Sequence, residues 1–173
     1  MEQIEFPDFP TVDRPFKELR FRPLNRPIWT ENKAKLIERY LFYFVCVTHH
    51  GDYIDGFAGP QKPGEPTMWA AKLVLESEPK QLRKFFLCEK QRKGYRALEA
   101  LKNDQTPVKG RDIYLYNGDF NENVHRIRAS NLIGQKEATF CLLISVRLDH
   151  LEKLWQSRWS RRTLTIIGGQ YLL

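Results

Sequence analysis

Apolar residues recur at intervals of three and four positions between residues 30 and 48. This spacing places apolar side chains on one face of an α-helix. Thr30 precedes the run and suits an N-cap, and Gly51 follows it. The pattern predicts an amphipathic helix that starts at Thr30 and ends near residues 47–50. Its apolar stripe consists of Leu36, Ile37, Tyr40, Leu41, Phe44 and Val45.

Short apolar runs then alternate with helical patterns. We expect helices over 67–76, with Thr67 as the cap, and over 92–101 and 123–130. Strands that alternate with helices at this spacing imply parallel crossovers, so the sequence predicts an α/β fold with a parallel sheet. The expected strands are 53–57, 84–89, 113–116 and 138–143, and another is expected at 163–167.

Residues 1–28 show neither helical nor alternating periodicity and hold five of the ten prolines of the chain. Proline fixes φ and removes a backbone donor, so this segment is expected to be an extended arm that lies on the domain. Its aromatic residues would dock it: Phe6, Phe9, Phe16 and Phe21.

Composition narrows the class of protein. The chain has 173 residues, 42% hydrophobic and 28% charged, which suits one globular domain. No apolar run approaches the roughly 20 residues that span a bilayer, so we expect no membrane partner. Residues 1–5 are acidic and lack the layout of a signal peptide, which predicts a cytoplasmic location.

Three cysteines within apolar stretches are expected to be reduced core thiols: Cys46, Cys88 and Cys141.

The formal net charge of +7 suits a polyanionic partner such as nucleic acid. Much of this charge lies between residues 80 and 96. The segment is a candidate nucleic-acid contact, and an ordinary solvated surface is the alternative interpretation. The candidate residues are Lys80, Arg83, Lys84, Arg92, Lys93 and Arg96.

The residues that follow the strands carry the candidate chemistry, because ligands of an open parallel sheet bind outside the carboxyl ends of its strands. After the first expected strand the chain reads Asp55, Gly56, Phe57, Ala58 and Gly59. The glycine backbone allows a nucleoside to approach closely. Glu89, after the second strand, could accept hydrogen bonds from both ribose hydroxyls. Asp119 could accept from an adenine amino group with Phe120 beside the ring, and Asp55 could reach an ammonium group or an ordered water.

A mononucleoside such as S-adenosylmethionine fits this pattern better than a dinucleotide. The chain lacks GxGxxG, and 34 residues separate Asp55 from Glu89, against the roughly 20 of a compact dinucleotide fingerprint. The alternative is that each carboxylate only caps the helix that follows its strand. A metal site at His49 and His50, beside Asp52 and Asp55, is disfavoured because adjacent histidines project differently.

Several segments resemble the three-Cys-motif partner (TcmP) family. They are the Trp29-Thr30-Glu31-Asn32-Lys33 run, the YIDGFAGP run at 53–60, Gly64-Glu65-Pro66, Glu89 and Gly118-Asp119-Phe120. The similarity covers residues 29–143 and is most specific at 53–60. It implies a Rossmann-like fold of the S-adenosylmethionine-dependent methyltransferase type, S-adenosylmethionine as cofactor, and a three-Cys-motif protein as partner.

Two departures from that family bear on activity. Gln61 stands where the family usually has glycine. After residue 143 the family usually has an Asp-led motif, whereas this chain reads Ile144-Ser145-Val146-Arg147. The favoured explanation is a truncated or frameshifted sequence after Leu143, which would leave the sheet without strands five to seven. A divergent basic C-terminal segment, 144–173, is the alternative.

The leading function expected from the sequence is methyl transfer from S-adenosylmethionine to an unknown acceptor, for which the net charge favours nucleic acid. Because methyl transfer to a nucleophilic acceptor depends mainly on positioning, no catalytic residue is identified. Two alternatives stay open. One is a non-catalytic module that binds a nucleoside or nucleic acid together with a partner protein, and the other is an inactive gene fragment.

Overall fold

The computed structural model describes residues 26–60, 64, 66, 69–78, 80–134, 136–144 and 163–168. The first 25 residues of the predicted arm lie outside this part of the chain. So do residues 145–162 and 169–173, which make up most of the divergent basic segment expected over 144–173.

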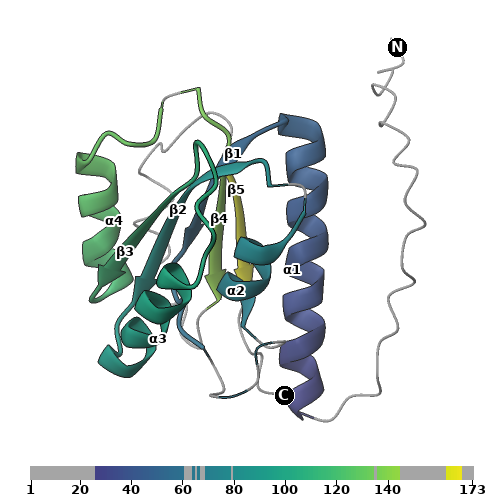
Figure 1. Cartoon of the computed structure of the whole chain (residues 1–173), viewed down its shortest axis with the longest axis vertical. Coiled ribbons are helices and arrows are strands. Elements are labelled where there is room, and N and C mark those ends of the chain that lie inside the picture. The colour runs from purple at the N-terminus through teal and green to yellow at the C-terminus, as the bar shows by residue number, and fades with distance from the viewer. Residues whose placement is uncertain are drawn as a thin grey trace.

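The core of the fold is a parallel sheet of five strands in the order β3-β2-β1-β4-β5 (Figure 1). The α/β class and the parallel pairing are confirmed, and the arrangement is Rossmann-like. The strand expected at 163–167 is confirmed as β5, which pairs with β4. A sheet that is incomplete beyond these strands stays a prediction. The strands are β1 (Gly51–Asp55), β2 (Leu82–Glu89), β3 (Asp112–Asn117), β4 (Thr139–Ile144) and β5 (Thr163–Gly168).

The described part of the chain also contains the helices α1 (Arg26–Thr48), α2 (Ala70–Glu76), α3 (Arg92–Asn103) and α4 (Phe120–Ala129). Their starts differ from the sequence prediction. Helix α1 begins at Arg26, so Thr30 lies inside it, and Pro27 falls in the first turn, where proline needs no backbone partner. Helix α2 begins after Trp69, which provides no side-chain cap, and not at Thr67.

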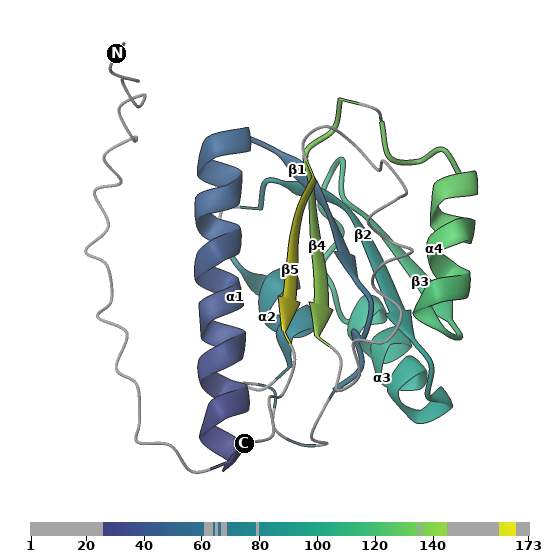
Figure 2. The ribbon, with the colours of Figure 1, turned by 180° about the vertical axis from the view of Figure 1, so that it is seen from behind.

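Alternation along the strands divides the core into two clusters. Tyr53, Phe85 and Phe140 belong to the cluster that includes side chains of α1, α2 and α3. Ile54 and Phe86 belong to the cluster on the opposite face, which α4 covers beside β3 (Figure 2). Each inner strand is therefore buried on both faces, as expected for a parallel sheet.

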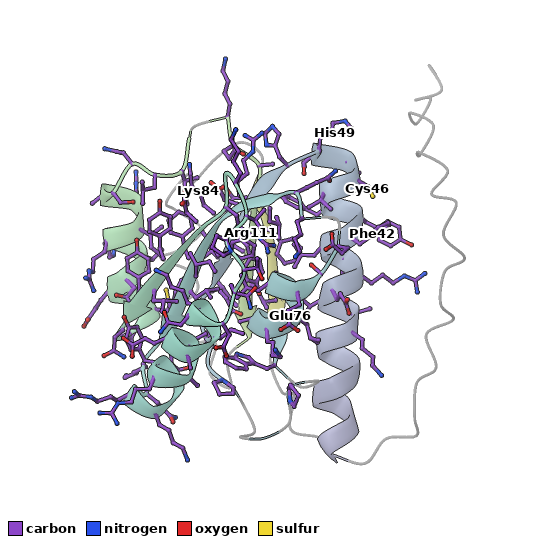
Figure 3. The ribbon with its side chains drawn as sticks, in the orientation of Figure 1. Phe42, Cys46, His49, Glu76, Lys84 and Arg111 are labelled. Carbon is purple, nitrogen blue, oxygen red and sulfur yellow. The ribbon has the colours of Figure 1, made fainter. Side chains whose placement is uncertain are left out.

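The cysteines occupy two different environments. Cys88 and Cys141 are buried free thiols on the face of α4, as predicted, and burial raises the pKa of Cys141 to about 12. Cys46 is a half-buried free thiol on α1, on the side away from the sheet (Figure 3), so its assignment to the core is wrong.

Among the described residues, no helix is both long and apolar enough to cross a membrane.

Candidate nucleoside-binding site

The ends of β1, β2 and β3 bring the predicted site residues to one edge of the sheet, called here the carboxyl edge. In the strand register, Asp55 lies beside Leu87, and Glu89 lies beside Asn117. Glu89 therefore extends two residues beyond the end of β1, about 7 Å at strand geometry. This extension places its side chain alongside the turn that follows β1.

Asp55 shapes that turn. Its Oδ1 accepts a hydrogen bond from Phe57 N at 2.9 Å, and its Oδ2 accepts one from the Tyr53 hydroxyl at 3.0 Å. The residue is only 3% exposed, and burial raises the pKa of its carboxyl to about 6. Both oxygens thus hold the chain's own groups, and contact with an ammonium group or a water stays a prediction.

Glu89 joins the two halves of the site. Its Oε2 accepts from Gly59 N at 2.9 Å, and its Oε1 accepts from Gln91 N at 2.7 Å. A Cβ added at Gly59 would overlap Oε2, and one added at Gly94 would lie 2.9 Å from the Glu89 carboxyl carbon. Glycine at both positions lets the backbone approach this carboxylate closely.

Further hydrogen bonds hold the turn against β2, β4 and the residue that precedes α2. Ala58 N donates to Cys88 O at 2.8 Å, and Trp69 Nε1 donates to Ala58 O at 2.6 Å. Gly56 N donates to Leu142 O at 3.1 Å. The role of Trp69 was missed from sequence, because its partner lies 11 residues earlier, across a loop whose path the pattern does not define.

Asp119 caps α4, as the alternative interpretation of the strand-end carboxylates predicts. Its Oδ1 accepts from Asn121 N at 2.9 Å, which starts the helix at Phe120 and not at Asn123. Its Oδ2 accepts from Lys90 Nζ at 3.1 Å. The bond from Asn121 N, with the Lys90 ammonium, lowers the pKa of Asp119 below its usual value. Sequence reasoning missed the contact with Lys90.

Two aromatic side chains lie at this edge. Phe120 is only 5% exposed and packs in the core cluster beside α4, whereas Phe57 is 43% exposed. Their ring centroids are 6.4 Å apart. Of the two, Phe57 is therefore the ring that offers a surface to a ligand, whereas the sequence predicts Phe120 beside the adenine ring.

The predicted basic patch falls into two groups separated by β2. The eight residues of β2 span roughly 23 Å, so the two groups lie at opposite ends of this strand. The group at the start of β2 comprises Lys80, Arg83 and Lys84, and the group at the start of α3 comprises Arg92, Lys93 and Arg96.

The two groups also differ in their contacts. Lys84 Nζ donates to Leu132 O at 2.6 Å and lies with His49 at the end of the molecule opposite the carboxyl edge (Figure 3). Arg92, Lys93 and Arg96 are exposed on the first two turns of α3, directly after Glu89. The structure therefore brings only the second group near the candidate site.

The histidine cluster does not assemble into a metal centre. His50 Nδ1 lies 2.8 Å from Glu137 Oε1, while Asp52 and Asp55 point to opposite faces because three positions separate them along β1. Among the residues that the structure describes, no three His, Cys, Asp or Glu side chains are grouped to hold a metal ion.

Comparisons with protein families, curated proteins and solved structures find no match for this chain.

Proposed function

We propose that the carboxyl edge binds the adenosyl group of S-adenosylmethionine and that the protein is a methyltransferase of the three-Cys-motif partner type. The observation that carries the proposal is the Glu89 carboxylate, held at the end of β2 by Gly59 N and Gln91 N. It lies at the carboxyl ends of neighbouring parallel strands, where open α/β sheets bind their ligands.

The residues present fit the ribose of such a cofactor. A carboxylate oxygen offers about two acceptor positions, so one position on each Glu89 oxygen remains after the bonds from Gly59 and Gln91. Vicinal ribose hydroxyls supply two donors on adjacent carbons. Because the carboxylate is fixed by backbone donors, little side-chain entropy is lost when the sugar binds.

The base would lie toward Asp119 and Phe57. Asp119 Oδ2 has one acceptor position beyond the bond from Lys90, which suits an exocyclic amino group. The exposed face of Phe57 suits contact with the purine ring. Asp55 supports both indirectly, because its bond to Phe57 N sets the course of the turn.

Bound S-adenosylmethionine supplies an electrophilic sulfonium methyl group. The protein would then act by positioning an acceptor in line with that carbon. We propose nucleic acid as the acceptor, because the exposed group Arg92, Lys93 and Arg96 begins three residues after Glu89. A three-Cys-motif protein is proposed as a partner on the resemblance alone.

A second candidate is a binding module without transfer activity. The reading Ile144-Ser145-Val146-Arg147, where the resembling family has an Asp-led motif, favours it. Incubation of the protein with methyl-labelled S-adenosylmethionine and separate DNA, RNA and protein acceptors distinguishes the two. The methyltransferase proposal predicts label in one acceptor class and none with Glu89→Ala. Binding of the cofactor without label in any acceptor supports the module instead.

A further inference from the structure

Strand β3 forms one end of the sheet. It pairs with β2 on one side, and no strand of the described residues pairs with its other side. Figures 1 and 2 show β3 at the margin of the sheet, beside α4. Its residues are exposed or half-buried, whereas those of β1 are all buried. In the described part of the chain, the outer edge of β3 is therefore open over roughly 20 Å.

The backbone groups that lie on this outer edge follow from the pairing with β2. Gly118 N donates to Glu89 O, so this amide points toward β2. Backbone groups of successive strand residues point alternately to the two sides of a strand. The N–H and C=O groups of Ile113, Leu115 and Asn117 therefore point outward and can pair with a further strand.

The composition of β3 does not protect this edge. Proteins commonly guard an edge strand with lysine, with proline or with a bulge. The strand Asp112–Asn117 contains neither lysine nor proline, and its register with β2 is continuous. Its four central residues are instead aliphatic or aromatic, and such residues favour strand pairing. An edge of this kind suits the addition of another strand.

The side chains on the α4 face of β3 form a row with opposite charges at its two ends. Asp112, Tyr114 and Tyr116 share this face, because side chains two positions apart in a strand point the same way. Asp112 is exposed at one end of the row. At the other end, the guanidinium carbon of the exposed Arg126 lies 5.7 Å from the centroid of the Tyr116 ring.

We propose that β3 of a second copy of this chain pairs with this edge, antiparallel and related by a two-fold axis at Tyr114. The antiparallel copy reverses the row of charges, so Asp112 of each copy lies opposite Tyr116 and Arg126 of the other. The same register places Ile113 opposite Leu115 of the second copy. Because both residues point their backbone groups outward, each such pair can exchange its N–H···O bonds.

The arrangement of charge favours a second copy over a different partner. A two-fold interface brings the same patch of both copies together, so that patch must be complementary to itself. The row from Asp112 to Arg126 meets this condition, since its negative and positive ends exchange places in the antiparallel copy. The inference does not rest on cofactor binding, because it uses only the outer edge of β3 and one side chain of α4.

The size of the edge predicts a weak dimer. A strip about 20 Å long and about 20 Å deep, the depth of a sheet with a helix layer, measures roughly 400 Å² per copy. This area is about half of the roughly 800 Å² per partner in a stable interface. We therefore expect a Kd on the order of tens of micromolar, so the protein should be largely monomeric near about 1 µM.

Sedimentation of the full-length protein from about 1 to about 200 µM, a range that brackets this Kd, tests the proposal. Asp112→Arg and Arg126→Asp each bring like charges together at both ends of the interface, so each should weaken the dimer at least tenfold. The double variant restores opposite charges in reversed order and should recover the dimer. Arg128→Asp, at an exposed position of α4 on a different side of the helix, is the matched control and should dimerise like the parent.

Three results would overturn the proposal. The first is a parent protein that stays monomeric over the whole range. The second is dimerisation of either single variant as strong as that of the parent, and the third is a double variant that does not recover it.

Disulfide trapping tests the register independently. Tyr114→Cys is made in a Cys46→Ser background, so that the half-buried thiol of α1 does not interfere. Residue 114 lies on the proposed axis in a pair without backbone hydrogen bonds, where Cα atoms are about 4.5 Å apart and a disulfide can form. Asn117→Cys in the same background is the control, because six positions along the strand, about 20 Å, separate it from its counterpart. We expect oxidation to link Tyr114→Cys at least tenfold faster than Asn117→Cys, and equal rates would overturn the register.

Discussion

The carboxylate of Glu89 lies against the backbone of Gly59, and its Oε2 accepts the Gly59 N–H at 2.9 Å. They are 30 positions apart in the chain, and the segment between them includes the Gly- and Pro-rich turn and α2. This contact therefore ties the turn after β1 to the end of β2. The proposed ribose site depends on it, because it fixes both the carboxylate and the glycine backbone.

Gly59→Ala is expected to weaken cofactor binding at least tenfold, since the added Cβ displaces the Glu89 carboxylate. The lost hydrogen bond should lower the free energy of unfolding by only about 1 kcal/mol. Calorimetric titration and urea unfolding measure the two effects. Gly134→Ala is the matched control, because its Cβ would meet its nearest neighbour at an ordinary 3.8 Å. Equal binding by Gly59→Ala and the parent would contradict the proposed geometry.

Replacement of Asp55 should separate the shape of the turn from its charge. Asp55→Ala leaves the buried Tyr53 hydroxyl and Phe57 N without their acceptor, at a cost of roughly 1–3 kcal/mol. Asp55→Asn keeps an acceptor for Phe57 N and removes the buried charge. Thermal unfolding at pH 7.5 should therefore rank Asp55→Ala well below Asp55→Asn, and the opposite order would refute this role.

Asp52 should make the protein less stable as the pH rises. It is fully buried at the other end of β1, and neither carboxylate oxygen has a hydrogen-bond partner among the described residues. Burial raises its pKa from 3.8 to about 6. Because the folded state holds the proton more tightly, the contribution to stability is full below pH 3.8 and is lost as pH rises through about 6.

Asp52→Asn should consequently raise stability at pH 7.5 by up to about 3 kcal/mol and have a much smaller effect near pH 4. Urea unfolding across this pH range measures the difference. The control is Asp112→Asn, an exposed residue at the start of β3. A gain that does not depend on pH would show that the buried charge of Asp52 is not its cause.

Asp119 should contribute to stability through α4. Asp119→Ala removes the cap on Asn121 N and should cost about 1 kcal/mol. Asp119→Ser keeps a capping oxygen but loses the charge that faces Lys90, so it should recover most of this stability. Chemical unfolding of both variants decides the matter, and equal losses would assign the effect to the ion pair.

The periodicity of the chain predicted the alternation of strands and helices and the parallel sheet, because both follow from local patterns of apolar residues. Helix starts were predicted less well. Pro27 resembles a helix breaker in sequence but is tolerated in the first turn of α1, and Asp119 starts α4 earlier than the apolar pattern suggests.

The position of the candidate site at the carboxyl edge was also predictable, because parallel strands end together. Its internal contacts were not. The bond between Lys90 and Asp119 joins residues 29 positions apart, and it forms only when β2 and β3 are paired in this register. The burial of Asp55 likewise depends on Tyr53 reaching it from the same face of β1.

Calorimetric titration of S-adenosylmethionine into the full-length protein tests the central claim most directly. The account predicts saturable binding with a Kd on the order of micromolar, at least tenfold weaker binding by Glu89→Ala, and unchanged binding by the control Glu122→Ala in the first turn of α4. No binding by the parent protein, or equal binding by Glu89→Ala, would contradict it.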